Sequence, residues 1–521
     1  MRHGKESVSA AFLLFLFSFL FFHVLRIPVP LNVDTYLYAR AIGSFDGPVI
    51  HFGYYIIGSL CHFLLGPMGV TPLQSLGYMS QFFGGVSVAG IYMFTFLLTK
   101  DRVHSFLTAC ILMFSGAFWL FSIHGEVYVP QLAFVLLSLI CLLKIRPLLS
   151  SIFILIAVSI TPTSLLALVP LCYVMYMTRL NTKGFIYFTT PILLAFILMI
   201  SWDGPRVIRT FADAIHSPEV FFEKFSYIGM FRGVAYDLIK AYGRSFNLIC
   251  FFAIFGLVAM YKKEPRLRGL MLAFLLPFFA YFLNLGLFSD DHLIISFIAV
   301  SFLGSYGILR LLDMANAHGA IRVLFIALLL LSYLSMSFEF SIDRQRIYAR
   351  ELKRVIHAVS AEYPQNGIML SDYNFGVSFE SITGEETSND LFAGSPSGFL
   401  NQDGISEKEA SERLNKKFWI AFACLPAFAS RPEFASLMDE RPVYFVDRID
   451  WPIGFVQVFK TLLINMGFEK PTKQNQRRKN IKAYLAYQLN ADISIKKCID
   501  SPLHPVYVMK PVRRTEGGPP I

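Results

Sequence analysis

The sequence predicts a polytopic α-helical membrane protein that carries a soluble α/β domain after its last span. Of its 521 residues, 55% are hydrophobic and 16% are charged, and Phe alone occurs 53 times. Soluble domains usually have about 25% charged residues, so the composition excludes an ordinary soluble enzyme, a disordered chain and a disulfide scaffold.

The charged residues are concentrated at the C-terminal end. Residues 341–521 hold 24 Lys and Arg and 21 Asp and Glu, while the first 340 residues hold the other 22 and 15. We therefore predict two domains, a transmembrane module over 1–340 and a soluble domain over 341–521.

Eleven apolar runs predict about eleven membrane-spanning helices, since roughly 20 apolar residues cross a bilayer. The first is interpreted as a retained signal anchor, because no small-residue cleavage site follows it. A break at Thr161-Pro162-Thr163 predicts a tight hairpin over 148–178, because proline disrupts a helix interior. The runs are 8–25, 76–99, 104–122, 127–143, 149–160, 163–178, 184–202, 246–260, 269–288, 293–309 and 321–338.

The distribution of Lys and Arg predicts the orientation, since these residues collect in cytoplasmic loops. With the N-terminus in the cytoplasm, the short outer connections at 123–126, 161–164 and 289–292 contain no Lys or Arg. The loops 26–75 and 203–245 and the C-terminal domain then lie outside the cytoplasm. The apolar segment 49–65 would invert this arrangement as a span, so we interpret it as a helix at the outer membrane interface.

The C-terminal domain has the pattern of a small α/β fold. Apolar runs at 367–370, 418–422, 442–446 and 505–509 predict buried strands, and 406–417 and 454–466 have helical character between them. This domain shows no glycine-rich phosphate loop and no metal-ligand spacing.

Candidate functional residues gather in the outer connections. Acids and imidazoles there can act as bases or metal ligands, and arginines can bind a phosphate. Simpler explanations stay open: helix capping for Asp34 and for Asp290-Asp291-His292, a helix-dipole contact for Glu126, and lipid head groups for the basic loop. The candidates are Asp34, Asp46, His51, Tyr54, Glu126, Arg206, Arg209, Arg232, Asp290, Asp291 and His292.

Over residues 8–180 the order of spans and local motifs resembles the GT-C membrane glycosyltransferases, in particular the protein O-mannosyltransferase-like group. An acidic residue lies early in the first external loop, an apolar interfacial helix follows, and an aromatic motif leads into the second outer connection. The motifs are Asn32-Val33-Asp34-Thr35-Tyr36, His51-Phe52-Gly53-Tyr54-Tyr55, Phe118-Trp119-Leu120-Phe121 and Gly125-Glu126-Val127-Tyr128.

The resemblance implies an inverting transfer of a sugar from a polyprenyl-phosphate donor to a hydroxyl of a protein, lipid or glycan, outside the cytoplasm. Asp34 would be the general base and Glu126 would support the site, and the remaining candidates would bind substrate. No cofactor or nucleic acid is expected, and a divalent metal is possible but not favoured. The alternatives are a transporter or flippase of a lipid-linked or envelope substrate and a non-catalytic envelope assembly factor.

Overall fold

The chain folds into two units. The computed structural model describes residues 2–27, 33–42, 51–195, 197, 241–285, 290–362, 368–371, 418–421, 443–446, 492–499 and 506–512. One unit comprises Met1–Ile27 and Leu37–Arg344, and the other comprises Pro28–Tyr36 and Gln345–Ile521. The short helix α2 (Val33–Ala41) crosses the division. The division into a catalytic module and an extracytoplasmic domain at residue 340 stays a prediction.

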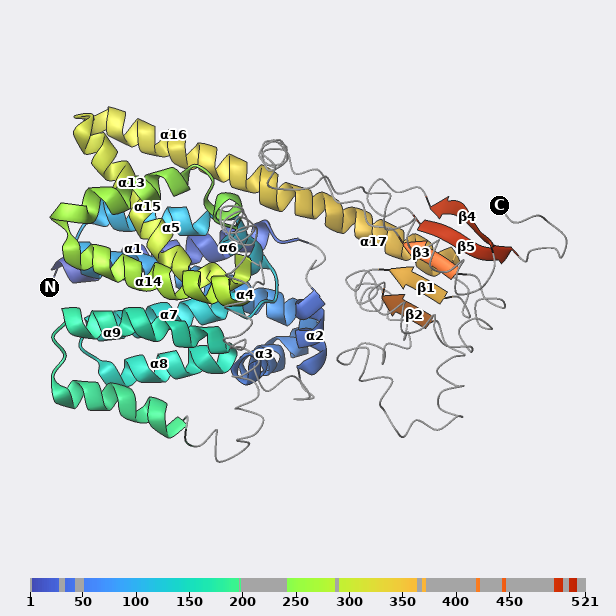
Figure 1. Ribbon diagram of the computed structural model, residues 1–521, viewed down its shortest axis with the longest axis horizontal. Helices are drawn as coiled ribbons and strands as arrows, with labels where there is room; N and C mark the ends of the chain where they lie inside the picture. Colours follow the sequence, from blue (N-terminus) through green and yellow to red (C-terminus); the bar gives the residue numbers. More distant parts are fainter. Residues whose placement is uncertain are drawn as a thin grey trace. The chain divides into compact units, whose positions relative to one another are not determined.

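The first unit is a helical bundle (Figure 1). Short 3-10 segments η2 (Gly66–Met68), η3 (Pro162–Ala167) and η4 (Asp290–Ser296) connect some of its helices, and the π-helical segment η5 (Phe338–Asp343) follows the last one. Its main helices among the described residues are α1 (Arg2–Val24), α3 (Phe52–Leu65), α4 (Pro72–Thr99), α5 (Arg102–Met113), α6 (Gly116–Ile123), α7 (Tyr128–Leu143), α8 (Pro147–Ile160), α9 (Leu168–Met177), α13 (Ile249–Lys263), α14 (Pro265–Leu285), α15 (Phe297–Met314) and α16 (Gly319–Ser337).

Four helices of the described residues are long and apolar enough to cross a membrane: Glu6–Val24, Pro72–Thr99, Leu293–Met314 and Gly319–Ser337. Shorter apolar helices cover Tyr128–Leu143, Pro147–Ile160, Pro162–Met177 and Ile249–Tyr261. The apolar runs found in the sequence therefore coincide with helices, and the protein is a membrane protein. The count of eleven spans stays a prediction.

One predicted span is interrupted. Helices α5 and α6 meet at an angle of 65° across Phe114 and Ser115. Ser115 and Gly116 form a serine–glycine pair at the bend, and such pairs are a common cause of sharp helix kinks. The run 104–122 is thus one bent element instead of a straight helix.

The stretch 148–178 folds around Pro162, as its sequence suggests. Helix α8 ends at Ile160, Thr161 is extended at φ −156°, and η3 leads into α9. Proline at the first position of η3 needs no amide donor there, so it begins the new segment without loss of a hydrogen bond.

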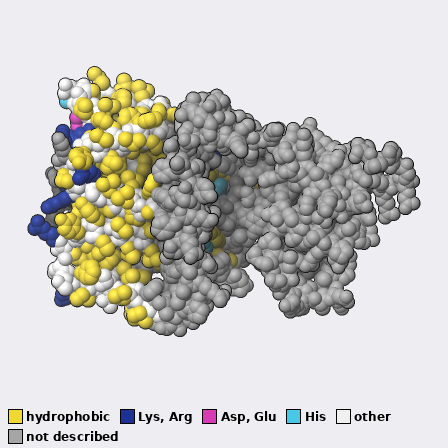
Figure 2. All heavy atoms as spheres, in the orientation of Figure 1, with side chains coloured by type: hydrophobic (Ala, Val, Ile, Leu, Met, Phe, Trp, Pro, Cys, Tyr) yellow, Lys and Arg dark blue, Asp and Glu magenta, His cyan; other side chains and the backbone are white. Residues whose placement is uncertain are grey.

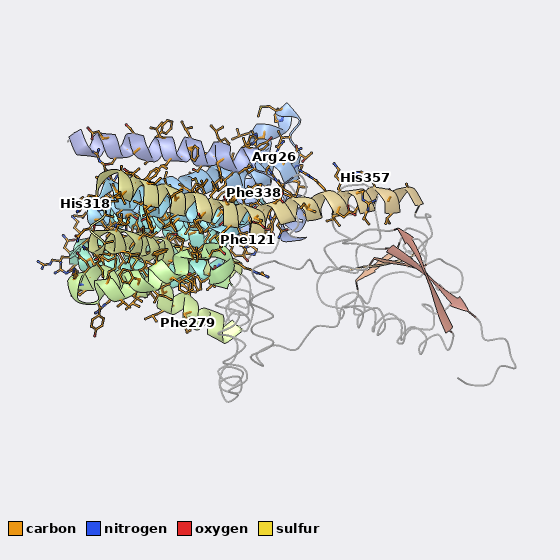
Figure 3. All side chains as sticks on the ribbon, turned by 90° about the horizontal axis from the view of Figure 1, so that it is seen from above. Arg26, Phe121, Phe279, His318, Phe338 and His357 are labelled. Carbon is orange, nitrogen blue, oxygen red and sulfur yellow. The ribbon has the colours of Figure 1, made fainter. Side chains whose placement is uncertain are left out.

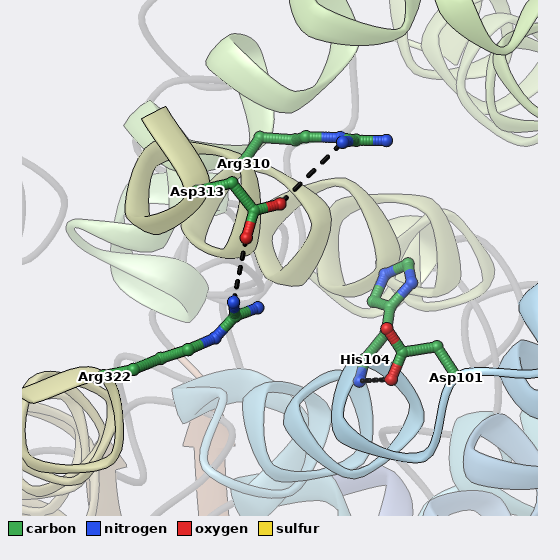
Figure 4. A network of polar contacts seen from close by, with 5 residues as sticks. All are labelled: Asp101, His104, Arg310, Asp313 and Arg322. Carbon is green, nitrogen blue, oxygen red and sulfur yellow. Dashed lines mark hydrogen bonds and ion pairs between the residues drawn. The ribbon is translucent and has the colours of Figure 1, made fainter. Parts of the chain in front are cut away.

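Basic residues collect at the end of the bundle where α4, α7, α13 and α15 finish (Figures 1 and 2). We call this the basic end. Asp313 lies there between two arginines, 3.8 Å from Arg310 and 2.8 Å from Arg322 (Figure 4). Asp101 caps α5 by accepting from the amides of Val103 at 2.8 Å and His104 at 3.1 Å.

Figure 3 shows the two ends of the bundle from a second direction. His318 lies at the basic end, and Arg26, Phe121 and Phe338 lie toward the opposite end of the bundle. We call this opposite end the site end, because α3 and α6, which adjoin the predicted site motifs, lie there (Figure 1).

The second unit contains helix α17 (Arg344–Glu362) and a five-stranded sheet with the order β2-β1-β3-β5-β4. Three adjacent strands, β2 (Phe418–Ala421), β1 (Ile368–Ser371) and β3 (Val443–Val446), are parallel, and β5 (Val506–Val512) and β4 (Asp492–Ile499) add antiparallel pairs. Each predicted strand segment overlaps a strand, and β4 was not predicted. The expected helices 406–417 and 454–466 lie outside the described residues, so the α/β assignment stays a prediction.

Candidate active site

Four segments meet at the site end of the bundle. They are the first turns of α3, the connection between α6 and α7, the 3-10 segment η3 and the 3-10 segment η4. Helix α3 packs against α4 and α8, and η4 packs against α6, α7, α14 and η3. The turns that the sequence analysis assigned to the outer face are therefore neighbours in space.

Helix α3 is apolar on its exposed side and closely packed on the other. Gly53, Tyr54, Tyr55 and Gly58 are buried. The exposed side carries Phe52, Ile56, Leu60, Phe63 and Leu64, each more than 40% exposed. Such a surface suits contact with lipid, and the interfacial position of this helix stays a prediction.

The N-terminal turn of α3 lies directly against α8. A Cβ at Gly53 would overlap the Ser159 hydroxyl oxygen and would lie 2.9 Å from the Ser159 Cβ. Only glycine allows this approach, and it brings His51 beside the end of α8.

His51 is fixed by the backbone of that end. Its Nδ1 lies 2.8 Å from the Ile160 carbonyl oxygen, so Nδ1 carries the proton and donates. Burial lowers the pKa of His51, and the bond to Ile160 offsets part of this effect. The neutral ring therefore presents Nε2 as a hydrogen-bond acceptor.

Tyr38 contacts His51 and two further tyrosines at the start of α3. The Tyr38 ring lies 5.5 Å from the His51 ring, 5.0 Å from Tyr54 and 6.0 Å from Tyr55, in edge-to-face arrangements. The rings of Tyr54 and Tyr55 lie 6.4 Å apart. We call Tyr38, His51, Tyr54 and Tyr55 the aromatic cluster.

The connection between α6 and α7 places two titratable groups in the interior. Glu126 is fully buried, and His124 is 3% exposed. Burial lowers the pKa of His124 to about 4, so its ring is neutral at ordinary pH. Among the described residues, His124 Nε2 has no hydrogen-bond partner.

Tyr54 links the aromatic cluster to Glu126. Its pKa is raised well above the usual value, first by burial and next by the negative charge of Glu126. The Ser80 hydroxyl lies near enough to offset part of this increase, without meeting hydrogen-bond geometry. The Tyr54 hydroxyl thus keeps its proton and faces an acidic neighbourhood.

A polar contact holds the tip of the α8–α9 hairpin against α7. Gln131 donates to the Thr163 hydroxyl at 2.9 Å, and Thr163 lies 3.3 Å from the Thr161 hydroxyl. Together with the bond from His51 to Ile160, this contact fixes η3 beside the buried acid.

The predicted site residues differ in how far the structure describes them. His51, Tyr54 and Glu126 come together at the site end. Asp34 lies in the first turn of α2 rather than at the cap before it, and Asp290, Asp291 and His292 begin η4; the side chains of these four residues lie outside the description. Also outside the described residues are Asp46, Arg206, Arg209 and Arg232.

Within the described side chains, no group of three or more His, Cys, Asp or Glu residues could hold a metal ion. Sequence reasoning missed Tyr38, Tyr55 and Gln131. Tyr38 follows Asp34 by four residues and Gln131 follows Val127 by four. Each of these residues is therefore close in sequence to a motif that was identified. Their burial, however, is visible only in the packed structure.

No protein-family model and no curated protein sequence matches the chain. Among solved structures, the oligosaccharyltransferase of Archaeoglobus fulgidus in complex with Zn and sulfate is 14% identical, with a TM-score of 0.51, over 96% of this chain and 88% of that one. ArnT of Cupriavidus metallidurans, bound to undecaprenyl phosphate, is 10% identical with a TM-score of 0.46, over 97% of both chains.

The match to the oligosaccharyltransferase concerns the fold, since the sequences are only 14% identical. It extends over nearly the whole chain, beyond the residues 8–180 that carried the resemblance in the sequence. The chain shares the fold of this oligosaccharyltransferase.

Proposed function

We propose that the protein is an inverting glycosyltransferase that moves a sugar from a polyprenyl-phosphate donor to a hydroxyl acceptor on the extracytoplasmic face. The observation that carries the proposal is a buried acid, Glu126, whose charge acts on Tyr54 of α3, in a bundle whose basic residues gather at the other end. A structural helix contact does not need a buried carboxylate, which is costly to desolvate.

In the proposed reaction, Asp34 accepts the proton of the acceptor hydroxyl. The hydroxyl oxygen forms a bond to the anomeric carbon while the bond from that carbon to the phosphate oxygen breaks. The polyprenyl phosphate leaves with the electron pair, and Arg206, Arg209 and Arg232 stabilise its charge. One displacement inverts the anomeric centre.

The described residues contribute to this reaction mainly through their positions and charges. Because Glu126 and Tyr54 are fully buried, their role is to set the position and charge of the first loop. His51 Nε2 can accept a hydrogen bond from a substrate hydroxyl. Asp46, Asp290, Asp291 and His292 would contact the sugar or line the rim, and the acceptor would be a protein, lipid or glycan.

The test uses the purified full chain in lipid nanodiscs with a panel of polyprenyl-phosphate sugars and mixed acceptors. We expect a glycosylated product of inverted configuration, detected by mass spectrometry and by NMR of the anomeric proton. Asp34→Asn should lower the rate by about 100-fold or more, the usual contribution of a general base.

The matched control is Asp313→Asn, which changes an acid at the basic end. It should keep the wild-type rate. Full activity of Asp34→Asn would contradict the assignment of the base. Movement of the intact lipid-linked sugar between leaflets, without a product, would contradict the transferase and favour a flippase.

A further inference from the structure

We propose that Tyr38 is a positioning residue: its contacts within the aromatic cluster set the rotation of the short helix α2, and therefore the face of that helix on which Asp34 lies. The inference rests on the proposed function in one respect, the role of Asp34 as the base.

Tyr38 makes the central contacts of the aromatic cluster. Its ring meets three others edge-on, with centroids 5.0 Å from Tyr54, 5.5 Å from His51 and 6.0 Å from Tyr55. It is only 6% exposed. Edge-to-face pairs are favourable beyond the area that they bury, because the positive edge of one ring faces the negative face of another.

Helix α2 depends on these contacts. It has 9 residues, and isolated helices shorter than about 12–15 residues are marginal in water. It also contains Val33, Thr35 and two tyrosines, which are weak helix formers. Tertiary packing must therefore decide where α2 lies and whether it forms.

Helix α2 is buried along its length, since Thr35, Tyr36 and Tyr38 are 0%, 5% and 6% exposed. Its contact with α3 is seen next to its C-terminal end. Ile42, directly after the helix, is 8% exposed. It approaches α3 at a glycine, since a Cβ at Gly58 would lie 3.1 Å from the Ile42 Cδ1. Tyr38 and Ile42 are four residues apart and thus form one stripe of the helix, which rests on α3.

Asp34 lies four residues before Tyr38 on the same stripe. The contacts of Tyr38 therefore fix the rotation of α2 about its axis and hence the face on which residue 34 lies. A general base must be placed within hydrogen-bond reach of its proton, so a change of this rotation should slow the chemical step.

The test compares Tyr38→Leu, which removes the ring, with Tyr38→Phe, which keeps the edge-to-face contacts. Tyr38→Leu should lower kcat by about 100-fold, as expected when a distant change misplaces a reacting group, while KM changes less than about threefold. Tyr38→Phe should keep kcat within about threefold, because the ring geometry persists. Tyr176→Leu, at a position that is 73% exposed, is the control and should behave as wild type.

Two further measurements separate positioning from general loss of structure. In Tyr38→Leu, amide hydrogen exchange should accelerate in residues 33–41 and stay unchanged in α4 and α7. In the Asp34→Asn background, Tyr38→Leu should cause no further loss of rate, since residues that act as a unit are not additive. Wild-type kcat in Tyr38→Leu, an equal loss in Tyr38→Phe, or faster exchange throughout the bundle would overturn the inference.

The outcomes distinguish this inference from the proposed function. If the wild-type protein forms no product with any donor, the proposed function fails, and the exchange of residues 33–41 still decides whether Tyr38 holds α2. If the wild type is active and Tyr38→Leu is equally active, only the positioning role fails.

Discussion

His124 enters the interior as a neutral ring, and this makes the site end sensitive to acid. Its pKa falls from 6.5 in an unfolded chain to about 4, because burial disfavours the charged form. Between these values the unfolded chain binds a proton that the folded chain does not. The free energy of unfolding therefore keeps its full value above pH 6.5 and decreases as the pH falls from 6.5 toward 4.

We therefore expect the thermal midpoint to fall as the pH is lowered from 7 to 5. The full shift corresponds to a stability change on the order of 3 kcal/mol. His124→Gln, which cannot titrate, should flatten this dependence when melting is followed at several pH values.

The control for this experiment is His318→Gln at an exposed loop of the basic end (Figure 3), which should leave the dependence unchanged. An equally steep dependence in His124→Gln would show that other groups cause it. His51 is one such group, because burial also lowers its pKa, and His51→Gln measures its part.

At the residue scale, the sequence could identify groups with suitable chemistry but not their surroundings. Glu126 and His51 were candidates because acids and imidazoles can act as bases or metal ligands and because both lie in motifs that resemble those of GT-C enzymes. The burial of Glu126 and the central contacts of Tyr38 depend on how α3 packs, and no local pattern encodes this. Tyr38 resembles any other aromatic residue of the first loop.

Among the elements, α3 depends most directly on a single glycine. Gly53→Ala would place a methyl group against the Ser159 hydroxyl and Cβ, and overpacking of this kind usually costs about 1–3 kcal/mol. The shift would also move His51 away from Ile160. We expect a lower thermal midpoint and a lower transfer rate.

Removing the opposing side chain tests this explanation. In the double variant Gly53→Ala with Ser159→Gly, the conflict is relieved and much of the lost stability should return. Gly77→Ala is the control, because a Cβ there meets nothing within 4 Å and alanine favours a helix by up to about 1 kcal/mol. A loss in Gly53→Ala that the second change does not relieve would point to another cause.

Helices α13 and α15 approach so closely that their glycines meet backbone atoms. A Cβ at Gly307 would overlap the Phe252 carbonyl oxygen, and one at Gly256 would overlap the Leu303 carbonyl oxygen. Small residues let membrane helices pack in this way. Because backbone cannot move aside as a side chain can, Gly307→Ala should lower the thermal midpoint more than Gly53→Ala does. An equal or smaller loss would show that these helices can separate at little cost.

At the element scale, hydropathy predicted the positions of the helices well, because the lipid-facing surface needs long apolar runs. It missed the bend between α5 and α6, although Ser115 and Gly116 were visible in the sequence. Strand β4 was missed because Lys496 and Lys497 interrupt its apolar pattern. It is a terminal strand of the sheet, and lysines are common on edge strands, where they discourage pairing with other chains.

The two ends of the helical bundle differ in charge, and this difference bears on the side of the membrane where the candidate site lies. Basic residues gather at one end of the bundle (Figure 2), and His51, Tyr54 and Glu126 lie among turns of the opposite end. Lys and Arg are retained on the cytoplasmic side of membranes. The basic end is thus expected in the cytoplasm, which would place the site outside it, as the proposed function requires.

Reporter fusions test this orientation independently of any activity. A reporter that is active only in the cytoplasm should work when inserted at the basic end, after Lys144 or after Ala317, and should be silent when inserted after Gly125. A reporter that is active only outside should give the reverse pattern and should also work after Glu362, beyond α17. The pair of insertions on either side of α7 is decisive, because this helix has 16 residues and lies at the short limit for a span. A cytoplasmic signal on both sides of α7 would mean that this helix does not cross the membrane. Glu126 would then lie on the cytoplasmic side, where the proposed transfer to an external acceptor could not occur.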